Sequence, residues 1–583
     1  MVKKITLKLT LWLAGIMILS CSKNLDLVTT DIKTGAYRFG TINELQMGTI
    51  PDSVNSIITM GYYTDGDGGG AQYYRVAVFT DSLPGDRISN GGTVRWRLAK
   101  TNGISIRAFG ARVDSTTDDA AAANDALLYA AQTGTPLLQP AGTMLVGAEL
   151  VFPSGAKWVG TGRERTFVRK TISHPGRMLI TKDFDMQSGS TITDESVLCK
   201  DVYISDITFD GTWMAGDKES YLNDNGGGGL FLYTAKSCYL VNVKVQNMCG
   251  IGIFTDAPGS SALDGIGGGR SGKLDNVYIE TTKEEGLIYK GISDRFDHNI
   301  IQWDAGARIN AESTDPVNYG PRSSPTYGST NGGRTDGVVL LKGMERAIIH
   351  SFGNTSGLGI RILDGRYNDC FFMAETCRYG GLSVNGGYGD QVTFQAFRTG
   401  GGGIGVDDAT PLVYYNAAGV GNVNYGNSYI SAYHVNTADK SPRPCVVFGP
   451  QARGFVGQVK TRGDNVPGHG IVIDGAATFL DLKIDVRGHL GNSGEVDANN
   501  NPILSSGVYR KATSSSRTIS IRGKVQNSAV GFRSSGTPRQ ERVEMEMWLQ
   551  AGQLPFAGDS ATLAGQVWDI TADVNGVTTN IRH

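Results

Sequence analysis

The chain of 583 residues is poor in charge and lacks the spacing patterns of common metal, nucleotide and nucleic-acid sites. Only 19% of its residues are charged, below the usual ~25%, and the formal net charge is −2. Binding to nucleic-acid phosphates requires a basic field, so this balance gives no reason to expect a nucleic-acid partner. The sequence contains no CxxC pair, no Cys/His pattern with zinc spacing and no phosphate-binding loop. We therefore expect no metal and no nucleotide cofactor.

Glycine, in contrast, is abundant, with 80 residues, but it follows no G-X-Y period, which excludes collagen. Hydrophobic residues make up 40% and aromatic residues 9% of the chain, enough for a large core, which excludes general disorder. A chain that is rich in glycine and poor in charge is typical of many short strands joined by tight turns.

The first 21 residues have the pattern of an export signal. Two lysines precede an apolar run at 5–19, which is shorter than a membrane span requires. The run ends at Ser20-Cys21, and a small residue before cysteine at this point resembles the bacterial lipoprotein signal. The resemblance implies cleavage before Cys21, lipid attachment to Cys21, and anchoring to a bacterial membrane at the cell surface or periplasmic face. An ordinary signal peptide with an incidental cysteine is the alternative. Residues 22–35 are predicted to form a polar tether.

Six cysteines remain after this segment. An exported protein can form disulfides, but several of these cysteines lie in apolar strand-like runs, where buried free thiols are at least as well expected. The six are Cys199, Cys238, Cys249, Cys370, Cys377 and Cys445.

Residues 36–100 are predicted to form a separate small β unit. Residues 61–76 contain two aromatic strand segments around a glycine turn, and residues 93–99 form another alternating strand. The turn Asp65-Gly66-Asp67 resembles part of a calcium loop, but the third acidic position and the distal glutamate are missing. A plain hairpin turn is therefore favoured, and Ca²⁺ is not indicated as a cofactor.

Residues 104–147 are predicted to form a strand, an acidic turn, an amphipathic helix and a second strand. Asp118 or Asp119 can cap the helix, and Gly134 can end it. The segment closely resembles the entry to the pectin-lyase-like right-handed parallel β-helix, in the branch shared by rhamnogalacturonases, pectate lyases and tailspike-like proteins. The matching residues are Phe109-Gly110-Ala111, Asp114, Thr117-Asp118-Asp119, Ala126-Leu127, Ala130, Pro140-Ala141-Gly142-Thr143 and Gly160-Thr161-Gly162. The resemblance implies an all-β solenoid over 101–550 whose open N-terminal end is capped by the helix, with a C-terminal β segment at 551–583.

A repeat supports the solenoid independently. Gly337, Gly359, Gly381 and Gly403 each precede a short apolar strand, at intervals of 22 residues. Second strands follow in near-identical phase at 347–352, 370–375 and 392–397. Looser copies begin at Gly252, Gly286 and Gly306, and further strands are expected at 470–475, 480–488, 507–511 and 519–527. A period of this length matches one coil of a parallel β-helix, with glycine where a side chain would clash between coils.

Alternation after these glycines predicts which side chains face outward. Positions one and three are almost all apolar and are expected in the core, so positions two and four are expected on the outside. Since adjacent coils lie ~4.8 Å apart, Asp256, Lys290, Arg308 and Asn310 are expected to form one outward patch across three coils. Glycine-, proline- and serine-rich insertions at 262–272 and 311–333 are predicted to wall a groove beside this patch.

The charged residues of these coils suit two reactions. Hydrolysis of a glycosidic bond requires a protonated carboxyl as acid and a second carboxylate as base or nucleophile. The candidates are Asp256, Glu285, Asp294 and Asp336. β-Elimination of a uronate requires a base and cations that stabilise the developing charge. The candidates for substrate binding are Lys290, Arg308, Asn310 and Arg361.

Carboxylates outnumber suitably placed bases, so the sequence favours a glycoside hydrolase acting on a polysaccharide, most simply an acidic one. A polysaccharide lyase is the first alternative, and a non-catalytic glycan-binding or adhesive β-helix is the second. The resemblance to tailspike-like proteins also implies a homotrimer as a candidate assembly, with a site shared between chains.

Overall fold

The computed structural model describes residues 37–582, except for the segments 78–80, 172–173, 175, 183–198, 213–227, 257–271, 283, 291–297, 306–335, 342, 354–357, 378–379, 398–410, 418–424, 435–443, 498, 512–516, 536–540 and 559–566. The predicted lipidation site Cys21 and the tether at 22–35 lie outside the described residues. The chain divides into two compact units, Met1–Ser82 with Asp86–Ala99, and Leu83–Gly85 with Lys100–His583.

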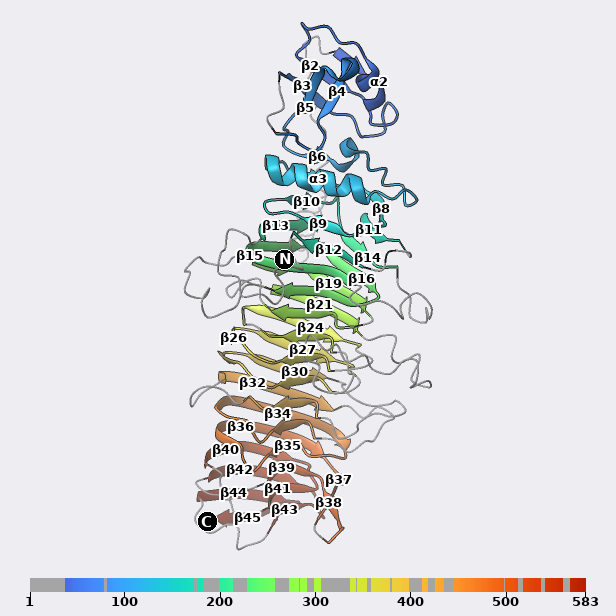
Figure 1. Cartoon of the computed structure of the whole chain (residues 1–583). Helices are drawn as coiled ribbons and strands as arrows, with labels where there is room; N and C mark the ends of the chain where they lie inside the picture. Colours follow the sequence, from blue (N-terminus) through green and yellow to red (C-terminus); the bar gives the residue numbers. More distant parts are fainter. Residues whose placement is uncertain are drawn as a thin grey trace, which may run out of the picture. The chain divides into compact units, whose positions relative to one another are not determined.

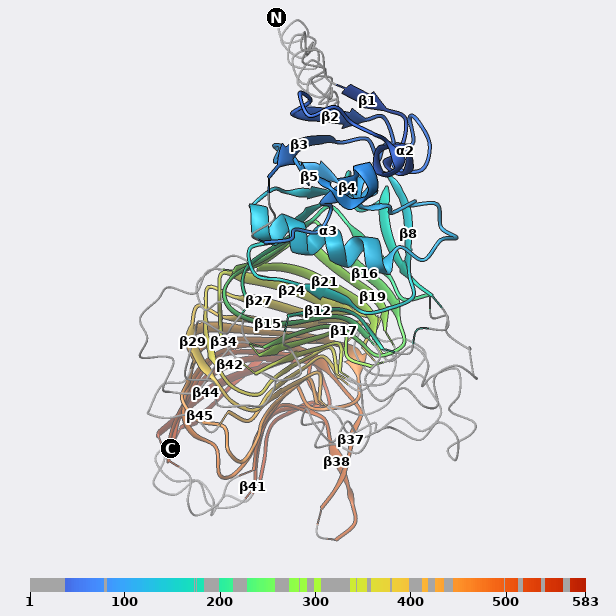
Figure 2. The ribbon, with the colours of Figure 1, turned by 45° about the horizontal axis from the view of Figure 1, so that its top comes forward.

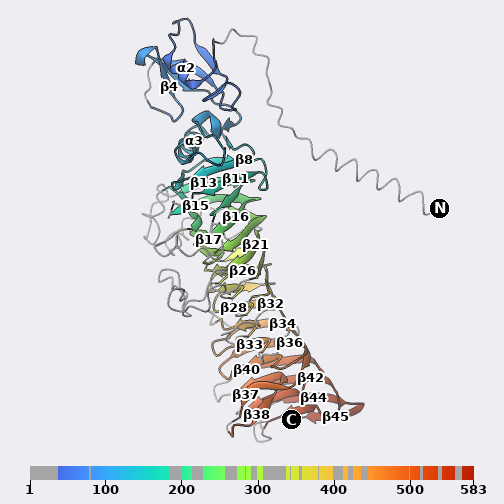
Figure 3. The same ribbon diagram turned by 90° about the vertical axis from the view of Figure 1, so that its right-hand side faces the viewer.

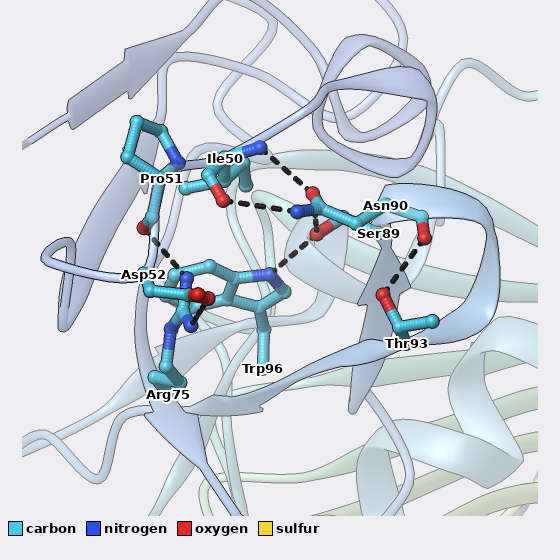
Figure 4. Close-up of polar contacts among 8 residues, drawn as sticks. All are labelled: Ile50, Pro51, Asp52, Arg75, Ser89, Asn90, Thr93 and Trp96. Carbon is cyan, nitrogen blue, oxygen red and sulfur yellow. Dashed lines mark hydrogen bonds and ion pairs between the residues drawn. The ribbon is translucent and has the colours of Figure 1, made fainter.

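The N-terminal unit is a five-stranded sheet with one short helix, α2 (Ile42–Met47). In sheet order the strands are β1 (Tyr37–Phe39), β2 (Ser56–Thr59), β3 (Gln72–Val76), β5 (Val94–Leu98) and β4 (Arg87–Ser89). Trp96 is fully buried, and its indole Nε1 donates a hydrogen bond to Ser89 Oγ at 2.9 Å (Figure 4). The Asn90 side chain bonds the backbone N–H and carbonyl of Ile50 at 2.8 and 2.9 Å, which fixes the chain beside Trp96.

The turn with the faint calcium-loop pattern is held together by its own backbone. The Asp67 carboxylate accepts hydrogen bonds of 2.7–3.1 Å from the backbone N–H groups of Tyr62, Tyr63, Thr64 and Gly69. Its oxygens therefore organise the turn.

The second unit is a parallel β-helix, as predicted (Figure 1). Successive coils contribute strands to three parallel sheets, which we name the ladder sheet, the broad sheet and the side sheet. The ladder sheet comprises β9 (Leu150–Phe152), β12 (Arg177–Thr181), β15 (Gly228–Val241), β17 (Ile251–Asp256), β20 (Leu287–Lys290), β22 (Val338–Leu340), β25 (Ile360–Ile362), β28 (Leu382–Val384), β31 (Val413–Tyr415), β33 (Val446–Phe448), β35 (Ile471–Ile473), β39 (Ser506–Lys511), β41 (Val530–Ser535) and β43 (Leu554–Ala557).

The broad sheet lies across the coil from the ladder sheet and contains several strands of nine to twelve residues. It comprises β8 (Gly142–Val146), β11 (Thr166–Lys170), β14 (Thr208–Asp210), β16 (Lys244–Met248), β19 (Val277–Thr282), β21 (His298–Ala305), β24 (Ala347–Phe352), β27 (Phe371–Glu375), β30 (Thr393–Phe397), β32 (Tyr425–His434), β34 (Phe455–Val466), β36 (Thr478–His489), β40 (Arg517–Gln526), β42 (Glu541–Leu549) and β44 (Val567–Val574). The short strands β23 (Met344–Glu345), β26 (Arg366–Asn368) and β29 (Tyr388–Asp390) join it through β32. The side sheet comprises β6 (Ile104–Ser105), β7 (Leu137–Leu138), β10 (Lys157–Val159), β13 (Cys199–Ser205), the end of β15 and β18 (Gly272–Asp275).

Both ends of the coil stack carry extra elements. Helix α3 (Ala120–Thr133) lies across the first coils (Figure 3), and Gly134 ends it in the left-handed conformation, as the sequence predicted. Asp118 Oδ1 accepts from Ala120 N–H at the helix start and from Gly147 N–H of the coil, which ties the helix to the coil it covers. At the other end β45 (Val577–Arg582) pairs antiparallel with β44. The hairpin of β37 (Asn492–Val496) and β38 (Pro502–Leu504) projects away from the coils (Figure 2).

The core is a stack of equivalent side chains along the coil axis. Inward residues of the ladder strands, such as Ile253, Leu287 and Val338, are fully buried. In the middle coils the stack becomes aromatic, with neighbouring ring centroids 5.4–6.0 Å apart. Its members are Phe372, Phe394, Tyr425, Tyr415, Phe448 and Phe455. The six described cysteines are all buried free thiols.

The predicted glycine ladder is confirmed in part. Val338 pairs with Ile360 and Ile360 with Leu382, so the two intervals of 22 residues between Gly337, Gly359 and Gly381 are real coils. The next rung, however, is β31, because Leu382 pairs with Val413. The prediction that Gly403 begins this rung is wrong, since the ladder position is filled there by Leu412, which accepts a hydrogen bond from Gly381 N–H.

At several glycines of the ladder sheet the spacing between coils leaves no room for a side chain. A Cβ atom on Gly507 would lie 2.5 Å from Val525 Cγ1 and 2.9 Å from the carbonyl oxygen of Gly531 on the next rung.

We expect Gly507→Ala to lower the free energy of unfolding by about 1–3 kcal/mol, since the backbone cannot move away without breaking hydrogen bonds of the ladder sheet. Urea unfolding measures the change. Gly576→Asn is the control, because Gly576 has φ +85°, a Cβ atom added there would meet no other atom within 4 Å, and asparagine tolerates this conformation. An equal loss in both variants would contradict the steric explanation.

Candidate functional site

Two of the predicted site residues lie side by side on adjacent rungs. Asp256 ends β17 and pairs in register with Lys290 at the end of β20. The predicted neighbours Arg308 and Asn310 lie outside the described residues, as does the candidate acid Asp294. The prediction that Gly306 begins the next rung is wrong, because Leu287 pairs directly with Val338. The insertion between these rungs is therefore longer than the repeat implied.

The outward column of the first rungs is apolar and closed to solvent. Phe231, Phe254, Ile288 and Val339 occupy successive outward positions, and each is at most 5% exposed. Together with Ile180, Tyr233 and Ile251 they form one buried cluster. Alternation predicted their direction correctly, but the expectation of a solvated face is wrong here, because apolar side chains fill these positions and are removed from water.

The column becomes polar at the next rung, where Arg361 follows Val339. The guanidinium Nε of Arg361 lies 2.6 Å from Asp336 Oδ2, and both residues are 2% exposed. The other oxygen, Asp336 Oδ1, accepts a hydrogen bond from the backbone N–H of Leu358 at 2.9 Å. A buried carboxylate with a cation and an N–H donor is stabilised in its ionised form. Arg361 Nη2 finds no hydrogen-bond acceptor in the part of the chain that the structure describes.

Glu285 is the second buried carboxyl of this region. It directly precedes Gly286, while Asp336 directly precedes Gly337, and the rungs that follow the two glycines pair with each other. Burial raises the pKa of Glu285 to about 8, and the nearby charges of Glu284 and Asp336 act in the same direction. Arg361 opposes the shift but does not cancel it. Glu285 is therefore mainly protonated at pH 7, while the Asp336 carboxyl is paired with a guanidinium and a backbone N–H donor.

The three side chains form a set with distinct chemical roles, which we name the buried triad: Glu285, Asp336 and Arg361. It offers one carboxylic acid that can donate a proton, one carboxylate held by a cation, and one guanidinium edge whose Nη2 has no acceptor among the described residues. The residues come from three neighbouring rungs, so the in-register stacking of the coils creates the group. The sequence predicted each of the three as a site residue, but it did not reveal the Asp336–Arg361 ion pair.

Beyond the buried triad, the outward column stays polar. Ser383 and Tyr414 follow Arg361 in register, and Ser383 Oγ donates to Asn385 Oδ1 at 3.2 Å. Burial, together with the charge of Asp474, raises the pKa of the half-buried Tyr414. Of the tyrosine pair at 414–415, Tyr415 points into the core and Tyr414 faces outward. No register could be predicted for this pair from the sequence, because no glycine marks the rung.

Two other kinds of feature are absent from the described residues. No group of three or more His, Cys, Asp or Glu side chains among them is arranged to hold a metal ion. Within the same residues, no helix has the length and apolar character that a membrane crossing needs.

Comparison with known proteins gives one family match. Residues 103–307 match the profile of the family described as rhamnogalacturonase A/epimerase, pectate lyase-like. A search of curated proteins returns no match.

The solved structures that align with this chain include three proteins at 11–13% identity and with a TM-score below 0.5. The enzymatically active domain of tailspike protein 2 from bacteriophage CBA120 aligns over 86% of this chain with 11% identity and a TM-score of 0.45, and this chain covers 64% of it. The A-module of the mannuronan C-5 epimerase AlgE4 from Azotobacter vinelandii aligns over 81% of this chain and 96% of its own length, with 13% identity and a TM-score of 0.31. WceF of Pantoea stewartii, a glycan biofilm modifying enzyme, aligns over 94% of this chain and 53% of its own length, with 11% identity and a TM-score of 0.31.

Proposed function

We propose that the chain is a polysaccharide-degrading enzyme of the pectin-lyase-like parallel β-helix superfamily that hydrolyses glycosidic bonds of an acidic polysaccharide, since residues 103–307 match the family described as rhamnogalacturonase A/epimerase, pectate lyase-like. The observation that carries the proposal is the different environment of two carboxyls on neighbouring rungs, which we assign as the protonated acid and the ionised carboxylate. Glu285 has its pKa raised to about 8, while Asp336 is held by Arg361 and by a backbone N–H. Glycoside hydrolysis requires this combination of one protonated and one ionised carboxyl.

The roles follow from the protonation states. Glu285 donates its proton to the oxygen of the leaving sugar. Asp336 either activates a water molecule or attacks the anomeric carbon, and the separation of the two carboxyls during the reaction decides between inversion and retention. Arg361 supplies the positive charge beside Asp336, and its Nη2, which has no acceptor among the described residues, is assigned to bind an acidic group of the substrate. A buried ion pair with a purely structural role is the competing interpretation, because all three side chains are less than a tenth exposed.

The reaction is tested directly by incubating the protein with polygalacturonate and other acidic polysaccharides. Hydrolysis produces new reducing ends without ultraviolet absorbance, whereas β-elimination produces both reducing ends and absorbing unsaturated uronates. Reducing ends without absorbance are the expected result. The absence of both products, with the glycan still bound, would overturn the enzymatic proposal in favour of a glycan-binding β-helix.

A lyase is the second candidate, because one specific feature favours it. The Nη2 donor of Arg361 suits the carboxylate of a uronate, whose charge must be stabilised when the C5 proton is removed. Removal of the C5 proton also requires a base that is neutral at pH 7, such as an uncharged histidine, and none of the three residues of the buried triad is of this kind. Hydrolysis is therefore preferred.

We also propose that the protein is exported and anchored to a bacterial membrane by lipid on Cys21, as the lipoprotein-like sequence at 5–21 suggests. Cys21→Ser is expected to abolish incorporation of radiolabelled palmitate and to move the protein from the membrane fraction to the soluble fraction. Cys445→Ser, which alters a buried cysteine of the β-helix, is the control and should leave both unchanged. Labelling that persists in Cys21→Ser would contradict the proposal.

A further inference from the structure

The outer face of the broad sheet carries a concentration of positive charge far from the buried triad along the chain. Strands β34, β36 and β40 are three successive rungs (Figure 1). Their outward positions hold six exposed cations, which we name the basic face: Lys460, Arg462, Lys483, Arg487, Arg522 and Lys524. The outward carboxylates on the same strands number three: Asp464, Asp481 and Asp485. The basic face is thus positive in a protein whose formal net charge is −2.

The register places like charges directly opposite one another at two positions, while Asp485 lies opposite both Lys460 and Lys524. Arg462 pairs with Arg487 across β34 and β36, and Lys483 pairs with Arg522 across β36 and β40. Like charges in directly opposed positions of a sheet destabilise it. A bound anion would offset the repulsion at these two positions.

The local carboxylates neutralise only part of this charge. Each of the three carboxylates forms an ion pair with one arginine, with N–O distances of 3.0–3.2 Å. The pairs are Arg462–Asp464, Arg487–Asp485 and Arg522–Asp481. For Lys460 and Lys483 no ion pair occurs with any described residue. Lys524 lies 3.7 Å from Glu546, at the far limit of an ion pair.

Aromatic rings border the basic face at both ends of one outward column. Tyr433 precedes Arg462 in register, stacks on Phe397 with ring centroids 5.2 Å apart, and lies 5.0 Å below the guanidinium of Arg462. At the other end Trp548 is 40% exposed, and Lys524 Nζ lies 5.0 Å from its ring centroid. Four rung spacings separate Tyr433 from Trp548, so the column extends ~19 Å along the coil axis.

We propose that the basic face binds an acidic polysaccharide chain along the coil axis, outside the buried triad. Cations at every rung match the repeated carboxylates of such a polymer, and the bordering rings offer apolar faces to its sugar rings. The exposed charges argue against a second copy of the chain as the occupant, since the core of a subunit interface is depleted of charge. The choice of polymer rests on the proposed function, but binding does not depend on the reaction.

Binding is tested by titration of polygalacturonate into the full chain carrying Glu285→Gln, which prevents cleavage during the measurement. We expect Lys460→Gln with Lys483→Gln to weaken binding about five- to tenfold, and Asp464→Asn with Asp485→Asn to strengthen it. Both differences should disappear at high salt, because the charges are exposed. All four positions lie on the surface, and equal urea midpoints would show that the variants remain folded.

The opposite signs of the two double variants make the proposal falsifiable. Unchanged affinity in both, or equal binding of neutral dextran, would overturn it. If the variants change the oligomeric state in light scattering but leave the affinity for polygalacturonate unchanged, the basic face is assigned to a second copy of the chain. If the protein binds anionic lipid vesicles and does not bind polygalacturonate, the basic face is assigned to a membrane surface. If Glu285→Gln alone does not affect cleavage, the proposed reaction site fails while the binding result stands.

Discussion

Glu285→Gln is expected to lower kcat on an acidic polysaccharide by a factor of about 10² to 10⁴, the usual contribution of general acid catalysis. Glutamine has nearly the same shape as protonated glutamic acid but cannot transfer a proton to the leaving oxygen. KM should change little, because the neutral side chain keeps its place among the same neighbours. Steady-state kinetics with reducing-end detection measures both quantities.

Stability separates this catalytic role from a structural one. Because the pKa of Glu285 is raised to about 8 in the folded state from the ordinary value of 4.5, the wild-type protein loses stability as pH rises from 4.5 through about 8. The Gln variant has no such loss, so it should be at least as stable as the wild type at pH 9. Glu284→Gln is the matched control, since it removes a neighbouring like charge and should shift the pH profile without reducing the maximal kcat. A destabilised Gln variant with normal kcat would assign Glu285 to structure alone.

Glu541→Ala is expected to lower the free energy of unfolding by about 3–5 kcal/mol, which is the usual cost of leaving one member of a buried ion pair unpaired. Arg510 and Glu541 are both fully inaccessible in their side chains, and Arg510 Nε lies 2.6 Å from Glu541 Oε1. Arg510 Nη1 also donates to the carbonyl oxygens of Ile473, Asp474 and Lys511. Removing the carboxylate would leave a guanidinium buried without a counter-charge.

The control is an ion pair of the same types on the surface. Arg522 and Asp481 lie 3.0 Å apart with side chains 54% and 43% exposed, so Asp481→Ala should cost less than about 1 kcal/mol. Urea unfolding measures both variants. The double variant Arg510→Met, Glu541→Leu should recover much of the loss, because it removes both charges together. Equal effects of Glu541→Ala and Asp481→Ala would refute the role given to burial.

The coil architecture was predictable because its physical requirements leave marks in the sequence. The approach of adjacent coils at Gly286, Gly359 and Gly507 leaves no room for a Cβ atom, so glycine recurs there. The helix of residues 120–133 was predictable from Asp118, which accepts a hydrogen bond from Ala120 N–H, and from Gly134, which ends the helix.

The predicted register was wrong where no glycine precedes the strand. The rungs at β31 and β33 follow Leu412 and Cys445 in place of glycine, so the period could not locate them. Gly306 and Gly403 have the right local pattern, but pairing between strands, and not local sequence, determines which segment becomes a rung. Period counting cannot measure the length of an insertion between two coils.

The residues of the candidate site could be proposed from the sequence, but their environment could not. Glu285, Asp336 and Arg361 are each charged residues near ladder glycines, which the repeat locates. Their burial could not be inferred, because alternation gives the direction of a side chain and not what covers it. The basic face was not predicted, because its cations lie on the broad sheet, and the glycines of the ladder sheet do not mark which positions of that sheet face outward.

The pH dependence of kcat in the wild-type protein tests the central claim most directly, namely that a buried, protonated Glu285 supplies the proton for bond cleavage. With a pKa of about 8, this acid is protonated below that pH and ionised above it. We expect kcat to stay high through pH 7 and to fall as pH rises through about 8, with this fall absent from the residual activity of Glu285→Gln. A rate that already falls near the ordinary glutamate pKa of 4.5, or one that is constant from pH 6 to 9, would contradict the account.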